Sequence, residues 1–116
     1  MPSTTEITVP QLSRLIGLPT SPAIIDVRTD EDFAADPRLT PGSTRRDFRT
    51  VPQWAAAYAG RDVIVTCQRG LKLSQGAAAW LRHEGIDAQS LDGGFEAWQS
   101  GGQGRWETSR VASSRN

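Results

Sequence analysis

Residues 63–84 read VIVTCQRGLKLSQGAAAWLRHE and place an apolar strand, a short polar loop and a helix in direct succession. The run begins with four β-formers, and a continuous apolar run of this kind is typical of a strand that is buried on both faces. Apolar residues then recur at helical spacing, and Gly85 follows as a helix stop. The stretch therefore predicts a strand–loop–helix unit in which Cys67 ends the strand.

Further apolar runs at residues 23–27 and, more weakly, 88–91 predict two more strands. Helical segments are expected around them at residues 12–16, 51–59 and 95–99, each followed closely by glycine. Strands that alternate with helices favour a parallel sheet. We therefore predict an α/β fold, a single three-layer domain with a central, mostly parallel sheet and helices on both faces.

The tetrapeptide TVPQ occurs twice, at residues 8–11 and 50–53. In each copy the threonine can cap a helix, the proline suits the first turn, and the glutamine can complete a capping box. Beside the first copy, Ile7 and Leu12 have the spacing of a hydrophobic staple. We interpret the repeat as shared capping chemistry, not as a duplicated domain.

The predicted helix from Ser74 has Ala77, Trp80 and Leu81 on one stripe, which is expected to face the core. His83 lies in its last turn, where a cation interacts favourably with the helix dipole. We therefore interpret the single histidine as a solvent-exposed residue at the helix end, not as a catalytic group.

The length of 116 residues fits one domain, which we place at residues 5–102, with residues 103–116 as a flexible C-terminal tail or linker. Thirteen Lys and Arg balance thirteen Asp and Glu, so no net charge favours nucleic acid or an anionic membrane. No apolar run approaches the ~18 residues of a membrane span, and residues 1–9 lack the pattern of a secretory signal. A cytoplasmic location is expected.

Cys67 is the single cysteine, which excludes an internal disulfide and a multi-thiolate zinc site, and we expect neither a metal nor a cofactor. The thiol lies at the end of a predicted parallel strand, beside a helix N-terminus, where open α/β sheets bind ligands. Loop amides and the helix dipole bind anions there and favour a thiolate. We expect Cys67 to be exposed at the mouth of the loop.

The candidate anion-binding loop after the thiol comprises Gln68, Arg69, Gly70, Leu71, Lys72 and Leu73. Arg69 and Lys72 add positive charge, and Gly70 can adopt the backbone angles that curl the loop. The alternative is a buried cysteine beside two incidental surface cations, because a free cysteine is commonly a small core hydrophobe. Position alone does not separate these interpretations.

Five motifs occur in order along the chain: IIDVR at residues 24–28 with Asp32-Phe33 after it, PGS at 41–43, CQRG at 67–70, SQGAA at 74–78 and LDGGFEAW at 91–98. Together they resemble the rhodanese-like sulfurtransferase family. The resemblance spans residues 5–102. It implies that Cys67 takes sulfane sulfur from thiosulfate or a similar small anionic donor as a persulfide and passes it to a thiol or cyanide. It also implies that the amides of residues 68–73 hold the donor.

Asp26 and Arg28 match the Asp-x-Arg motif of the family. A charge that closes a buried strand needs a partner. We therefore expect a charge-assisted pair that supports neighbouring loops and does not contact the substrate. Trp54 and Trp98 are interpreted as core aromatics.

Between Cys67 and Ser74 the chain has one residue more than the usual rhodanese loop. This longer loop resembles the loops of relatives that act on phosphate or arsenate. The resemblance implies an alternative enzymatic function, which is reductase or phosphatase-like chemistry on an arsenate-, chromate- or phosphate-type oxyanion. Those relatives close the loop with an arginine, where this sequence has Leu73. A tetrahedral dianion would therefore lack a bidentate partner at that position.

The loop and the basic pair Arg45-Arg46 also resemble rhodanese modules that precede chromate-resistance domains. That resemblance implies a C-terminal partner domain in a longer chain. It also leaves open a non-catalytic module that senses redox state or an anion. The retained thiol favours chemistry, although a redox sensor would also keep it.

Overall fold

The computed structural model describes residues 5–100, and the predicted tail at residues 103–116 lies outside them. The strands are β1 (Glu6–Ile7), β2 (Ala23–Asp26), β3 (Ser43–Arg45), β4 (Asp62–Thr66) and β5 (Asp87–Leu91). The helices are α1 (Val9–Leu15), α2 (Asp30–Ala35), α3 (Val51–Trp54), α4 (Lys72–His83) and α5 (Gly94–Ser100). Two 3₁₀ turns, η1 (Phe48–Thr50) and η2 (Ala55–Tyr58), flank α3.

The described strands form one five-stranded sheet in the order β1-β5-β4-β2-β3. Every neighbouring pair is parallel. In the central part of the sheet, Ile64 of β4 lies between Ile24 of β2 and Gln89 of β5. The parallel α/β sheet and the three predicted strands are therefore confirmed.

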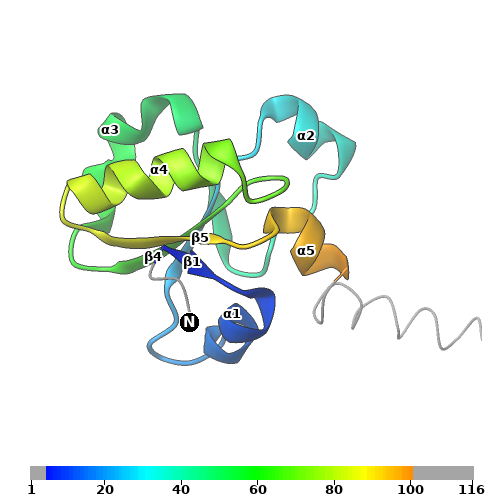
Figure 1. Ribbon diagram of the computed structural model, residues 1–116, viewed down its shortest axis with the longest axis horizontal. Helices are drawn as coiled ribbons and strands as arrows, with labels where there is room; N and C mark the ends of the chain where they lie inside the picture. The colour runs from blue at the N-terminus through cyan, green and yellow to red at the C-terminus, as the bar shows by residue number, and fades with distance from the viewer. Residues whose placement is uncertain (1–4, 101–116) are drawn as a thin grey trace, which may run out of the picture.

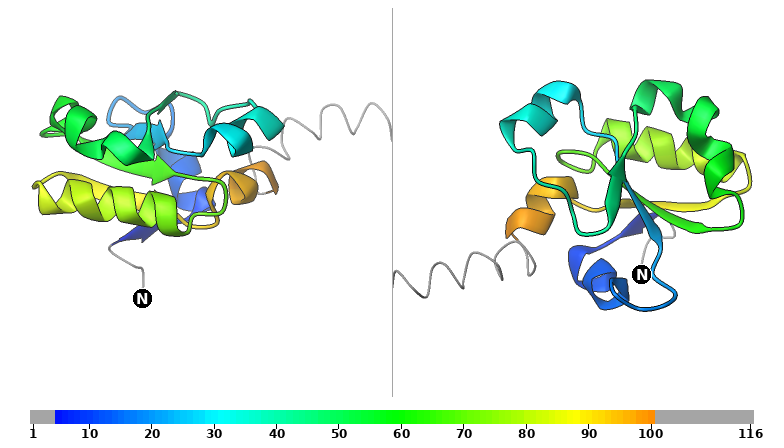
Figure 2. Two further views of the ribbon diagram at one scale, coloured as in Figure 1. Left: turned by 90° about the horizontal axis from the view of Figure 1, so that it is seen from above. Right: turned by 180° about the vertical axis from the view of Figure 1, so that it is seen from behind.

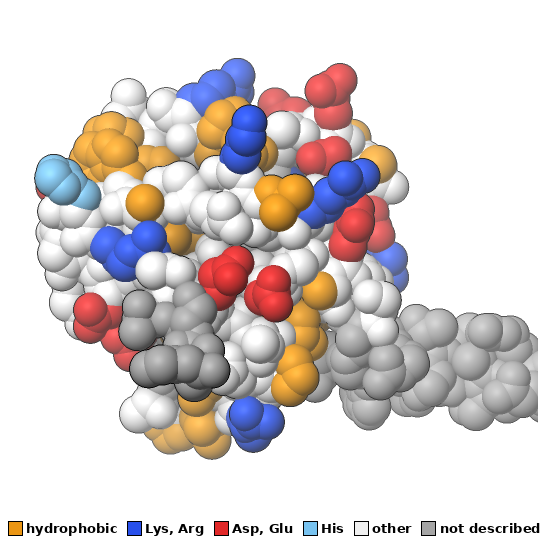
Figure 3. Space-filling model, viewed as in Figure 1, with side chains coloured by type: hydrophobic (Ala, Val, Ile, Leu, Met, Phe, Trp, Pro, Cys, Tyr) orange, Lys and Arg blue, Asp and Glu red, His pale blue; other side chains and the backbone are white. Residues whose placement is uncertain are grey.

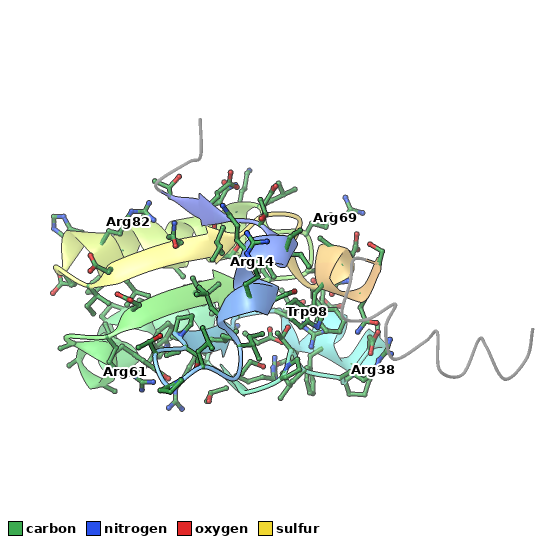
Figure 4. All side chains as sticks on the ribbon, turned by 90° about the horizontal axis from the view of Figure 1, so that it is seen from below. Arg14, Arg38, Arg61, Arg69, Arg82 and Trp98 are labelled. Carbon is green, nitrogen blue, oxygen red and sulfur yellow. The ribbon has the colours of Figure 1, made fainter. Side chains whose placement is uncertain are left out.

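Helices cover both faces of this sheet. Figures 1 and 2 show α3 and α4 on one side and α1 on the other. The core beneath α3 and α4 includes Ile25, Val65 and Leu81. The second core includes Leu12 of α1 and Trp98 of α5, and Figure 4 labels Trp98. The predicted three-layer arrangement is confirmed.

The first TVPQ copy begins α1 as predicted. The Thr8 hydroxyl accepts a hydrogen bond from the Gln11 amide at 3.3 Å, and the Gln11 side-chain oxygen accepts one from the Thr8 amide at 2.8 Å. Ile7 and Leu12 are both buried in the second core, where the staple was expected. Local sequence alone therefore determines the start of α1.

The second copy behaves differently, and its predicted side-chain cap is wrong. Thr50 is the last residue of η1, and its hydroxyl donates to the Asp47 carbonyl at 3.3 Å. The hydroxyl therefore bonds back to the preceding turn and makes no cap on α3. The helix expected over residues 51–59 is divided into α3 and η2.

Helix α4 begins at Lys72, slightly before the expected start near Leu73 or Ser74. Ala77 and Leu81 face the core as predicted, but Trp80 is 37% exposed. The buried stripe of α4 consists instead of Ser74, Ala77, Ala78 and Leu81, so it is centred to one side of Trp80. The prediction for Trp80 is therefore wrong.

His83 ends α4 and is exposed, as expected. Within residues 5–100, no helix is long and apolar enough to cross a membrane.

Candidate active site at Cys67

Cys67 directly follows β4 at the edge where the parallel strands end. Thr66, the last residue of β4, pairs in register with Asp26, the last residue of β2. Helix α4 then begins at Lys72. The thiol therefore lies between a strand end and a helix N-terminus, the position expected from the sequence.

The Cys67 residue is more buried than expected. It is 4% exposed, so the prediction of an exposed thiol is wrong. The Sγ donates a hydrogen bond to the Ser74 Oγ at 3.2 Å, and Ser74 is itself buried in the first turn of α4. Sequence reasoning used Ser74 only to mark the helix start and missed this contact.

A pocket of about 550 Å³ opens beside the thiol. Its lining residues are Asp32, Cys67, Gln68, Arg69, Leu71, Lys72, Leu73 and Glu96. The structure thus places Cys67 and all the predicted loop residues except Gly70 around one cavity. Asp32 and Glu96, which come from α2 and α5, were not predicted.

The predicted loop of residues 68–73 is shorter in the structure. Leu71 occupies the N-cap position, and the Gln75 amide donates to the Leu71 carbonyl at 2.9 Å. Lys72 and Leu73 therefore belong to the first helical turn. The first amides of a helix have no acceptor within it, so this end of α4 offers hydrogen-bond donors to an anion.

The back of the loop is attached to the start of α5. The Phe95 amide donates to the Cys67 carbonyl at 2.8 Å, and the Glu96 amide donates to the Gln68 carbonyl at 3.0 Å. Gly70 has a φ of +73° and lies against Leu91 and the following turn, where a side chain would overlap backbone atoms. The LDGGFEAW motif therefore supports the CQRG motif from behind.

Asp26 and Arg28 form the expected ion pair. The Arg28 Nε lies 2.9 Å from the Asp26 Oδ2, and both side chains are buried. The guanidinium also donates to the carbonyls of Asp36 at 2.9 Å and Arg38 at 2.6 Å. Its Cζ lies 3.9 Å from the centre of the Phe95 ring. Neither residue of the pair lines the pocket; the pair connects the segment after α2 to the start of α5.

Glu96 holds polar groups at the mouth of the pocket. Its Oε2 accepts a hydrogen bond from the Gln68 Nε2 at 3.2 Å and lies 3.8 Å from the Arg69 Nε. The Arg69 side chain, labelled in Figure 4, is 72% exposed. The mouth therefore combines two cations, Arg69 and Lys72, with the carboxylates of Asp32 and Glu96. Both carboxylates belong to quoted motifs, but nothing in their local pattern showed that they meet at the thiol.

Two carboxyl groups with shifted pKa values lie outside this pocket. A hydrogen bond from the Arg38 side chain lowers the pKa of Asp36, and one from Arg49 lowers the pKa of Asp47. Over the described range, no group of three or more His, Cys, Asp or Glu side chains is arranged to hold a metal ion.

Comparison of the sequence with known proteins identifies relatives of this chain. The model of the rhodanese-like domain family matches residues 8–101. The thiosulfate sulfurtransferase GlpE of Stutzerimonas stutzeri is 41% identical over 78 residues, which cover 66% of this chain and 69% of the relative. The protein of the same name from Pseudomonas aeruginosa strain LESB58 is 38% identical over 79 residues, with the same coverage of each chain.

A solved structure shows the same fold. The crystal structure of a rhodanese-like domain protein from Staphylococcus aureus superimposes with a TM-score of 0.71 at 27% sequence identity. The match covers 81% of this chain and 90% of the other. With its parallel sheet, its strand-end cysteine and the family match over residues 8–101, the chain belongs to the rhodanese-like domain family.

Proposed function

We propose that this protein is a sulfurtransferase that moves sulfane sulfur from thiosulfate or a similar donor to a thiophilic acceptor through a persulfide on Cys67. The observation that carries the proposal is the position of the Cys67 Sγ, beside a pocket and at the start of α4, in contact with the Ser74 hydroxyl. The names of the GlpE relatives support it.

In the first half-reaction, the Cys67 thiolate attacks the outer sulfur of thiosulfate. A new sulfur–sulfur bond forms, the bond within thiosulfate breaks, and sulfite leaves with the electron pair. In the second, cyanide or a thiolate attacks the outer sulfur of the persulfide, and Cys67 leaves as a thiolate. The covalent intermediate divides one transfer into two displacements. No other oxidant or reductant is required.

The protein has two groups suited to stabilise negative charge on the sulfur. The Ser74 hydroxyl lies 3.2 Å from the Sγ and donates to the Leu71 carbonyl at 3.4 Å; when Cys67 is ionised, the hydroxyl can turn and donate to the thiolate instead. The free amides at the start of α4 provide additional donors to an anion in the pocket. Together they favour the attacking thiolate and the leaving thiolate alike.

The oxyanion reductase or phosphatase alternative receives less support from the pocket. Among the residues that line the Cys67 pocket there is one arginine, Arg69, and it lies beside Glu96. Leu73 occupies the place where an arginine would grip a tetrahedral dianion. We therefore propose sulfur transfer and not oxyanion chemistry.

The test is to incubate the purified protein with thiosulfate and to measure its intact mass. We expect the addition of one sulfur atom, located on Cys67 by peptide mapping, and its loss when cyanide is added. The Cys67→Ser variant is the control, and it should acquire no sulfur and produce no thiocyanate. An unmodified wild-type protein after exposure to thiosulfate and to an organic persulfide would contradict the proposal.

A further inference from the structure

A second hollow of about 330 Å³ adjoins the Cys67 pocket. Its lining residues are Phe48, Arg49, Val51, Pro52, Lys72, Leu73, Gly76, Ala77 and Trp80. Lys72 and Leu73 line both cavities, so the hollow continues from the thiol across the first turn of α4. We call it the α4 groove.

Large apolar side chains are exposed along this path. Trp80 is 37% exposed at the α4 groove, and Leu71 is 55% exposed at the mouth of the Cys67 pocket. Figure 3 shows orange hydrophobic side chains separated by blue cationic ones over α4 and the loop before it. A segment bound along this path would bury apolar surface of both side chains, which favours binding.

The charge of the α4 groove is positive. Its lining contains Arg49 and Lys72 and no carboxylate. Arg49 is already paired with Asp47 at 3.1 Å. Lys72 forms no ion pair within residues 5–100, and it lies where the groove meets the thiol pocket. A carboxylate of a bound molecule would therefore find a partner between the two cavities.

We propose that the α4 groove binds a protein segment that carries the acceptor thiol. The segment combines a cysteine for the Cys67 pocket, a carboxylate for Lys72, and an aromatic or large aliphatic side chain for the apolar floor beside Trp80. This inference rests on the proposed function. The acceptor thiolate attacks the outer sulfur of the Cys67 persulfide, the bond from that sulfur to Cys67 breaks, and Cys67 leaves as a thiolate.

A substitution at Gly76 can block the α4 groove. A Cβ at this position would meet no atom within 4 Å, so a larger side chain fits and would project into the groove. Leucine is also a better helix former than glycine. The Gly76→Leu variant should therefore fold, and Ala79→Leu, at an exposed position of the same helix outside the groove, is its matched control.

The transfer experiment uses persulfide-loaded protein and short peptides that contain Cys, Glu and Phe, with one to four residues between Cys and Phe. The comparison peptide has Lys for Glu and Ser for Phe. We expect the best Glu/Phe peptide to have a KM about tenfold lower than the comparison peptide, and Gly76→Leu to remove this difference. Ala79→Leu should preserve it, and transfer to cyanide should be equal in all three proteins.

A binding experiment tests the groove without sulfur transfer. Fluorescently labelled peptides with Ser in place of Cys are titrated with the unloaded protein and followed by anisotropy. The proposal is overturned if the two peptides bind equally, or if Gly76→Leu binds the Glu/Phe peptide as tightly as the wild type does. Failure to form a persulfide would contradict the sulfurtransferase function alone, because the binding result does not depend on it.

Discussion

The backbones of Gly70 and Gly94 are in direct contact. A Cβ added to Gly94 would overlap the amide nitrogen of Gly70, and one added to Gly70 would lie 2.8 Å from the amide nitrogen of Gly94. Both residues have positive φ, +73° and +62°. This contact attaches the loop after Cys67 to the start of α5, so the position of the thiol depends on a motif that lies a strand and a helix further along the chain.

The Gly94→Ala variant should lose about 3 kcal/mol or more of unfolding free energy, because a positive φ costs about 1–2 kcal/mol and the overlap with backbone atoms adds to it. Urea unfolding measures this loss. Gly60→Ala is the matched control, since Gly60 also has a positive φ of +77° but has no atom within 4 Å of an added Cβ. Equal losses in the two variants would show that the close contact of Gly94 with the backbone of residues 67–70 contributes nothing to stability.

Replacement of Arg28 by Met should lower the unfolding free energy by about 3–5 kcal/mol, because Asp26 would remain as a buried, unpaired carboxylate. Arg28→Lys should not restore stability, since lysine cannot donate in a planar fork to Asp26 and to two carbonyls. Arg49→Ala, which breaks an exposed pair with Asp47, should leave the unfolding midpoint almost unchanged. If the Arg28→Met protein has the same unfolding free energy as the wild type, the buried pair is not required for stability.

The Ser74→Ala variant should slow iodoacetamide alkylation of Cys67 and turnover at neutral pH by about tenfold or more. The reason is the loss of a hydrogen bond to the thiolate, since such bonds to charged groups contribute about 1.5–3 kcal/mol. Ser74→Thr keeps the hydroxyl and should retain most of the activity. Circular dichroism checks that both variants fold. If Ser74→Ala reacts at the wild-type rate, the 3.2 Å contact between Cys67 and Ser74 has no role in reactivity.

Glu96→Gln should lower the KM for thiosulfate about two- to fivefold, because it removes a negative charge from the mouth of the pocket and releases Arg69. The gain should shrink as salt is added, since exposed charges are screened. Asp92→Asn makes the same change of charge on an exposed residue that does not line the pocket, and it should leave the KM unchanged. A comparable gain in Asp92→Asn would indicate a general effect of net charge.

Much of the central fold could be predicted from local patterns. The apolar runs of β2 and β4 identify buried strands, because only a strand covered on both faces tolerates continuous apolar residues. The capping box from Thr8 to Gln11 determines the start of α1 from adjacent residues alone. The place of Cys67 follows from the same patterns, since the residue after a parallel strand lies at the ligand-binding edge.

Elements that form only through distant partners were missed. Strand β3 (Ser43–Arg45) is short and has no apolar alternation, and it exists as a strand because it pairs with β2. Strand β1 (Glu6–Ile7) is likewise formed by pairing with β5. Trp80 was assigned to the core from its spacing, but the sheet contacts the stripe that contains Ala78 and leaves Trp80 at the surface.

For the candidate site, the sequence by itself determined the candidate nucleophile and the residues next to it, because Cys67 and the loop are contiguous and lie between a recognisable strand and helix. Only the tertiary structure decided what surrounds the sulfur. Ser74, in the first turn of α4, contacts the sulfur, and Asp32 and Glu96 line the pocket from two other helices, α2 and α5. Local sequence patterns do not predict such contacts, because the contacts depend on how the helices pack on the sheet.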